Sequence, residues 1–272
     1  MKKMLMTLLL AGAATLPASA HDFWLLPSDF QMEEAGATKV DFLIGHGTEV
    51  GPWKLRWDRI ASFRSHDEDG FADQQATIVP TTDAAAGGAM VALDGPGTHV
   101  IAFDSYHSFS DLEAEKFNGY TELEGLSQII SYRNDTDTAD SNGTELYSRR
   151  AKTIVQVGDE LTDQPLQPLG QTLEIVPLAH PYGLDDDRRL PVQVLFRGKP
   201  LEGALIDLTD LLSGKEPMQS ERTDAEGKAV FTVPAEGSWK LNVIWGWPNP
   251  GNDRAEFESI FSSLSFGYGE GE

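Results

Sequence analysis

The residue best placed to do chemistry is His21, which follows the segment MKKMLMTLLLAGAATLPASA. That segment has two lysines, an apolar run and a small-residue ending at Ala20, the pattern of a cleaved secretory signal. Cleavage after Ala20 would make His21 the first residue of the mature chain. Its α-amine, with an ordinary pKa of about 7.7, and its ring Nδ1 could then chelate one metal ion. Amine and imidazole nitrogens suit Cu, Ni, Zn or Co rather than Mg or Ca.

Further histidines are predicted to complete such a site. His46, in IGHG, ends a predicted strand between glycines that allow another group to approach closely. His107, in SYHSF, lies just after a strand, and His180, in LAHPYG, precedes a proline at a junction between domains. His99 lies in the middle of a strand and is expected to pack against its neighbours. The predicted metal ligands are therefore His21, His46, His107 and His180.

The residues that follow His21 have a second predicted role. Phe23, Trp24 and Leu25 are apolar and would anchor the new N-terminus against a sheet, which would prevent fraying. Asp22, between them and the histidine, carries a carboxylate that could bind a metal but is expected to be solvated.

The composition limits which partners and which cellular location are expected for the protein. The chain of 272 residues has 43 acidic and 21 basic residues and a formal net charge of −22, so it should repel nucleic acid and anionic lipid and attract cations. It contains no cysteine, and an exported chain without disulfides fits a bacterial periplasm. No apolar stretch approaches the roughly 20 residues of a membrane span, so no transmembrane segment is expected after signal cleavage.

No enzyme motif is present. The sequence lacks a glycine-rich phosphate loop, a GxSxG elbow and an HExxH helix. Carboxylates are so abundant that no acid and base pair can be singled out. The sequence therefore predicts a protein that is not an enzyme and has no catalytic residue.

Short alternating segments predict a mainly β fold of sandwich type. In TKVDFLIG, Val40, Phe42 and Ile44 lie on one face of the strand. The stretch TDAEG predicts a turn, because Asp224 can accept backbone hydrogen bonds and Gly227 can adopt a positive φ. Other predicted strands are GTHVIAF, RRAKTIVQVG, QTLEIVPL, LPVQVLF, LEGALIDL, KAVFTV, GSWKLNVIW and EFESIFSSLSF.

One helix is expected to interrupt the strands, over residues 110–133. Ser110 followed by Glu113 matches a capping box, and apolar residues recur behind it at roughly helical spacing. Gly119 and Gly125 weaken this helix.

The chain is predicted to have two β domains. Residues 1–20 form the signal, and 21–165 form an antiparallel β-sandwich-like domain with the helix and the metal site. Residues 166–248 form a β-sandwich of the immunoglobulin-like (Ig-like) kind. Residues 249–272 form a closing segment whose final strand is expected to return to an earlier sheet.

An ordered set of motifs resembles the DUF4198 family of exported bacterial proteins. The motifs are HDFWL, IGHG, PGTHVIAF, EAEKFNGYTELEGL, ELYSRRAKTIVQVG, QPLGQTLEIVPLAHPY, FRGKPLEGALIDL, TDAEGKAVFTV and SLSF. The resemblance implies a β-rich periplasmic protein related to components of nickel or cobalt uptake systems. It also implies an N-terminal β domain and an Ig-like or carboxypeptidase-regulatory-like C-terminal domain. It carries over His21 and His46 as candidate ligands. Arg149, Arg150 and Lys152 fit the family pattern too, with either a structural or a binding role.

The expected function is that of a periplasmic transition-metal-binding protein in metal uptake or homeostasis. The ion would be Ni²⁺, Co²⁺ or Cu²⁺, and an inner-membrane metal transporter or an outer-membrane receptor would be its partner. Two alternatives stay open. One is a metal-free β-sandwich that acts as a binding or scaffold module, and the other is a copper oxidase with a histidine brace.

Overall fold

The computed structural model describes residues 22–47, 49–211 and 216–268 as three β-sheets and two α-helices. The predicted signal segment and His21 lie outside the described residues. The mainly β fold of sandwich type is confirmed. No helix in the described ranges is long and apolar enough to cross a membrane.

A five-stranded sheet contains the first strand. Its strands are β1 (Asp22–Pro27), β3 (Gly36–His46), β4 (Glu49–Pro52), β7 (Ile78–Val79) and β8 (Gly88–Leu93). The order is β1-β3-β8-β7, with β4 paired to β3.

A ten-stranded sheet forms the centre of the molecule. The order β16-β15-β18-β19-β11-β9-β5-β6 makes its main path, and β2 and β10 pair with β11. Its strands are β2 (Gln31–Met32), β5 (Ile60–Asp67), β6 (Gly70–Asp73), β9 (Gly97–Ser105), β10 (Ser108–Leu112), β11 (Gly143–Val157), β15 (Leu205–Asp210), β16 (Gln219–Arg222), β18 (Gly237–Pro248) and β19 (Phe257–Tyr268). The sheet thus combines strands from both ranges that were predicted to be separate domains.

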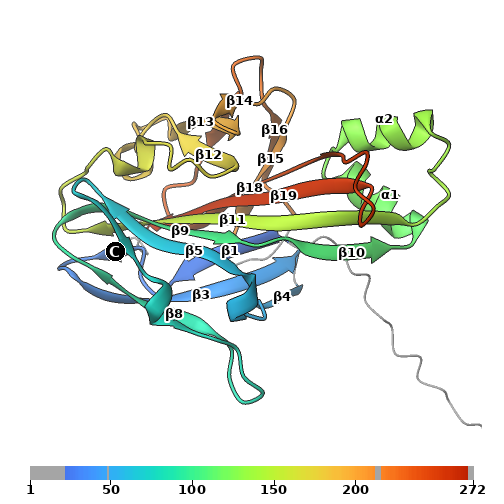
Figure 1. The fold of residues 1–272 in the computed structure, drawn as a ribbon. Coiled ribbons are helices and arrows are strands. Elements are labelled where there is room, and N and C mark those ends of the chain that lie inside the picture. Colours follow the sequence, from blue (N-terminus) through green and yellow to red (C-terminus); the bar gives the residue numbers. More distant parts are fainter. Residues whose placement is uncertain (1–21, 48, 212–215, 269–272) are drawn as a thin grey trace, which may run out of the picture.

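A four-stranded sheet covers part of the opposite face. It contains β12 (Leu173–Pro177), β13 (Arg189–Phe196), β14 (Lys199–Pro200) and β17 (Lys228–Thr232). Figure 1 shows the ten-stranded sheet as the middle layer, with β12, β13 and β14 on one side and β1, β3 and β8 on the other.

Two apolar cores hold the three layers together. Between the five- and ten-stranded sheets, Phe23, Phe42, Phe63 and Phe103 form a group of aromatic rings. The second core joins the ten-stranded sheet to the four-stranded one through residues such as Leu173, Val192, Leu208, Phe231 and Leu241. Because the middle sheet has a core on each face, its central strands are buried on both faces.

The predicted single helix is two helices, and its predicted start is wrong. These are α1 (Ala114–Leu123) and α2 (Ser127–Asp135), packed against the sheet through Phe117, Ile129 and Phe257. Ser110 belongs to β10 and pairs with Glu145 of β11, so it cannot cap the helix. The backbone of Ser110 is part of strand β10, and α1 begins after Glu113.

The closing segment forms β19, which pairs antiparallel with β18 and parallel with β11. The strands were expected to pair antiparallel, and the β11–β19 pair is an exception. Its parallel register runs from Glu145↔Phe257 to Thr153↔Ser265. This pairing places the end of the chain in the centre of the largest sheet.

Candidate functional site

Three side chains with metal-binding atoms converge at one end of the five-stranded sheet. Asp22, His46 and Glu124 each offer one ligand atom, and these atoms all lie within 4.8 Å of one another. Asp22 and Glu124 are both only 7% exposed, and His46 is half-buried. It is the one such group of three or more histidine and acidic residues in the described part of the chain.

The pairing of β1 with β3 brings Asp22 near His46. Asp22 begins β1 and lies opposite Gly45, the residue before His46 at the end of β3. A side chain at position 45 would overlap the backbone of Glu49 and Val50 in β4. The glycine predicted to allow close approach beside His46 therefore does so, and it lets β4 fold back over the site.

The third group comes from the end of α1. Glu124 follows the last residue of this helix, and its backbone N–H donates to carbonyls of the last turn. Gly125 then adopts φ 64° and ends the helix, a conformation that favours glycine. Burial raises the pKa of Glu124 well above its usual range, and the negative charges of Asp22 and Asp207 raise it further.

Asp22 is held by two side chains of β18. The Nζ of Lys240 lies 2.5 Å from Asp22 Oδ2, and Asn242 Nδ2 donates to Asp22 Oδ1 over 2.8 Å. The expectation that Asp22 is solvated is wrong, because β18 packs its polar side chains against the start of β1. Phe23, Trp24 and Leu25 are all buried, as the predicted anchor requires.

A small cavity adjoins these groups. It has a solvent-accessible volume of about 20 Å³, and its lining includes Asp22, His46, Glu124, Asp207 and Lys240. One water needs roughly 10–15 Å³ by this measure, so the cavity has room for an ion or a water. Burial also raises the pKa of Asp207, which accepts a hydrogen bond from Ser220.

The donor set fits a transition metal. Three atoms within 4.8 Å of one another lie no more than about 2.8 Å from a common point, and nitrogen and oxygen ligands bind such metals at about 2.0–2.2 Å. Side-chain movements of less than about 1 Å would close that difference. One imidazole with two carboxylates is a donor set accepted by first-row transition metals.

The other predicted ligands have different surroundings. His107 Nε2 lies 3.2 Å from Glu258 Oε1. His180 Nε2 lies 3.0 Å from the Thr98 hydroxyl, and its Nδ1 accepts from the backbone N–H of Tyr182. The structure therefore brings His46 to the cluster and does not bring His107 or His180 there. The predicted ligand His21 lies outside the described residues.

The sequence prediction missed Glu124 and Lys240 as members of this site. Glu124 lies in TELEGL, within the helix predicted over residues 110–133, and no ligand was expected there. The glycine directly after it was a usable signal, because a helix end marked by Gly125 brings the preceding side chain to the edge of a packed helix. No local signal marked Lys240, since its partner is 218 residues away.

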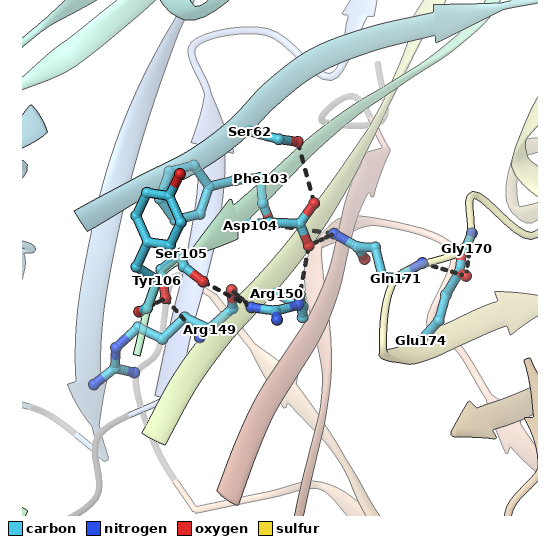
Figure 2. A network of polar contacts seen from close by, with 10 residues as sticks. All are labelled: Ser62, Phe103, Asp104, Ser105, Tyr106, Arg149, Arg150, Gly170, Gln171 and Glu174. Atoms are coloured by element: carbon cyan, nitrogen blue, oxygen red, sulfur yellow. Dashed lines mark hydrogen bonds and ion pairs between the residues drawn. The ribbon is translucent and has the colours of Figure 1, made fainter. Parts of the chain in front are cut away.

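A second buried polar network lies around Asp104 and Glu174. Figure 2 shows Asp104 accepting from Ser62 and Gln171 and contacting Arg150, with Glu174 accepting from Gly170 nearby. Burial raises the pKa of Asp104.

This network joins the segment before β12 to the middle sheet. Glu174 accepts the backbone N–H groups of residues 169–171 and pairs with Lys152 of β11. The family-like Arg150 and Lys152 thus both form ion pairs within the fold, and His99 is buried, as predicted.

Solved structures that are similar to this chain share very low sequence identity with it. The "D0-D1 domain of Intimin" is 12% identical, with a TM-score of 0.21 over 91% of this chain and 98% of that one. A "Biofilm associated protein - BSP domain" is 11% identical, with a TM-score of 0.20 over 89% and 29%. Native alpha-2-macroglobulin from Escherichia coli, domains MG0-NIE-MG1, is 12% identical, with a TM-score of 0.22 over 89% and 97%.

The family comparison is more direct. No curated protein matches the chain. Residues 18–246, which include Asp22, His46, Glu124 and Lys240, match the family described as "Domain of unknown function (DUF4198)". The chain therefore belongs to the DUF4198 family.

Proposed function

We propose that this protein binds a transition-metal ion, Ni²⁺, Co²⁺ or Cu²⁺, in the bacterial periplasm and serves metal uptake or homeostasis. The observation that carries the proposal is the convergence of Asp22, His46 and Glu124, with ligand atoms within 4.8 Å of one another. The ion is the cargo of the protein, and no catalytic step is part of the proposal.

The N-terminal histidine would supply the remaining donors. Consecutive Cα atoms are about 3.8 Å apart, so residue 21 is covalently tied next to Asp22, itself a member of the cluster. After cleavage at Ala20, the α-amine and imidazole of His21 would add two nitrogens to the nitrogen of His46. Such nitrogen-rich sets favour Ni, Co and Cu over Mg and Ca.

Charge and size support an ion as the ligand. The net charge of −22 attracts cations, and the cavity of about 20 Å³ suits an ion better than an organic substrate. A transporter or receptor of the cell envelope would exchange the ion with this protein.

The decisive experiment compares two versions of the protein that differ at the N-terminus. One begins at His21, with its mass verified, and the other carries one extra alanine before it. Titration with Ni²⁺, Co²⁺ and Cu²⁺ by calorimetry should give a Kd at least tenfold lower for the version that begins at His21. Equal Kd values would refute the terminal chelate, and absence of binding by both versions would refute the proposed function.

A further inference from the structure

Lys240 places its side-chain ammonium in the cavity of the proposed ligands. It is 4% exposed and lines the same cavity as Asp22, His46 and Glu124. Its Nζ lies 2.5 Å from Asp22 Oδ2. Asp22, one of the three proposed ligands, is therefore already paired with a cation that belongs to the protein.

The surrounding structure fixes this ammonium in position. Lys240 lies on β18, which is flanked on both sides, by Thr209 of β15 and Ser265 of β19 at this level. Its Nζ also lies 4.4 Å from the centre of the Trp24 ring, a cation–π contact. The side chain therefore has a defined resting position, unlike a lysine at the surface.

A metal ion at the cluster would compete with this ammonium. Asp22 uses Oδ1 for Asn242 and Oδ2 for Lys240, so an incoming ion must share or take one of these oxygens. It would then lie within a few ångströms of Nζ, where two positive charges repel each other strongly in a buried site.

We propose that Lys240 is an internal counter-cation, which a divalent ion must displace from Asp22 in order to bind. This inference rests on the proposed function and defines how its site is regulated. The ammonium neutralises Asp22 when no ion is present and weakens binding when one arrives. The site would consequently bind reversibly and release its ion to a partner, rather than store it.

The test removes the charge of Lys240 and keeps its length. Lys240→Met, in protein that begins at His21, should lower the Kd for Ni²⁺ at least tenfold in calorimetric titration. Lys240→Arg keeps the charge and should therefore not show the lower Kd for Ni²⁺. Lys228→Met is the matched control, because Lys228 is exposed on β17 and its loss changes the net charge by the same amount.

A folded Lys240→Met variant with an unchanged or raised Kd would overturn the inference while leaving the proposed function intact. Absence of Ni²⁺ binding by the wild type, Lys240→Met and Lys240→Gln would refute the proposed function itself. Binding by the Met and Gln variants but not by the wild type would also refute both, because the native protein would then neither hold the ion nor release Lys240 to it.

A measurement on the wild type is independent of whether these variants fold. The nitrogen-15 resonance of the Lys240 ammonium should shift when the protein is loaded with diamagnetic Zn²⁺, because the ammonium leaves Asp22 and the ring of Trp24. An unchanged resonance at saturating Zn²⁺ would contradict displacement. Lys240→Arg assigns the resonance by its loss.

Discussion

The ammonium of Lys152 lies 2.8 Å from the carboxylate of Glu174, and the two side chains are only 2% and 1% exposed. Each charge therefore offsets part of the desolvation cost of burying the other. Burial lowers the pKa of Lys152, and the charge of Glu174 opposes that shift. Glu174 also accepts three backbone N–H groups of the segment that leads into β12.

Removing one partner of this buried pair should destabilise the fold. Glu174→Gln is expected to lower the free energy of unfolding by about 3 kcal/mol, because an uncompensated buried lysine remains. Urea denaturation measures the change. Asp41→Asn is the matched control, since Asp41 pairs with Lys39 over the same 2.8 Å but at the surface, where such pairs contribute less than about 1 kcal/mol. Equal losses for both variants would contradict the structural role of the buried pair.

Metal affinity should depend on His46 and Glu124 but not on His107. His46→Ala and Glu124→Gln are each expected to raise the Kd for Ni²⁺ at least tenfold, because each removes a donor from the cluster. His107→Ala should leave the Kd within about twofold, since His107 contacts Glu258 instead. Loss of affinity in His107→Ala alone would place the site elsewhere.

The glycine at position 45 should be needed for both fold and site. Gly45→Ala is expected to destabilise the protein by about 1–3 kcal/mol, because the added methyl group overlaps the backbone of β4. It should also weaken Ni²⁺ binding by shifting His46. Gly51→Ala, on the neighbouring strand, meets nothing within 4 Å and serves as the control. Similar melting temperatures of the two variants would show that β4 can move aside.

The buried carboxyl of Glu145 should make the fold less stable as pH rises through the acidic range. Burial raises the pKa of Glu145 above its ordinary value of 4.5. A raised carboxyl pKa means that the folded state binds more protons than the unfolded state at any pH between the two pKa values. The stabilisation from Glu145 is therefore complete below pH 4.5 and is lost as pH rises through its pKa in the folded state.

Thermal unfolding of Glu145→Gln against wild type isolates this contribution. The variant should gain stability relative to wild type as pH rises from 4 to 7, because its amide does not ionise. The comparison is needed because burial lowers the pKa of His66 and His180, which makes stability rise with pH in the range below 6.5. A difference in melting temperature that is constant with pH would refute the raised pKa.

Local patterns predicted the parts of the fold that are determined locally. The turn at TDAEG has Asp224 Oδ1 accepting from the backbone of Glu226 and Lys228, and Gly227 at φ 72°. The alternation in β3 buries Val40 and Phe42 on one face, as expected. Both features depend on residues that are close in sequence.

Partners distant in sequence could not be predicted in this way. The parallel pairing of β11 with β19 depends on long-range packing, and nothing in either strand specifies its direction. The same holds for the site: His46 was recognised from its glycine-flanked strand end, whereas Glu124 and Lys240 join it only through tertiary contacts.

The contact between Asp22 and Lys240 spans 218 residues, and this separation has a consequence for the order of events during synthesis. The start of the chain emerges first and β18 almost last, so a partly emerged chain carries the N-terminal donors without the lysine that opposes a metal. The regulated site therefore exists only once the last strands have joined the sheet. A metal ion that bound before β18 joined the sheet would not compete with Lys240. Completion of folding would then lower the affinity for that ion.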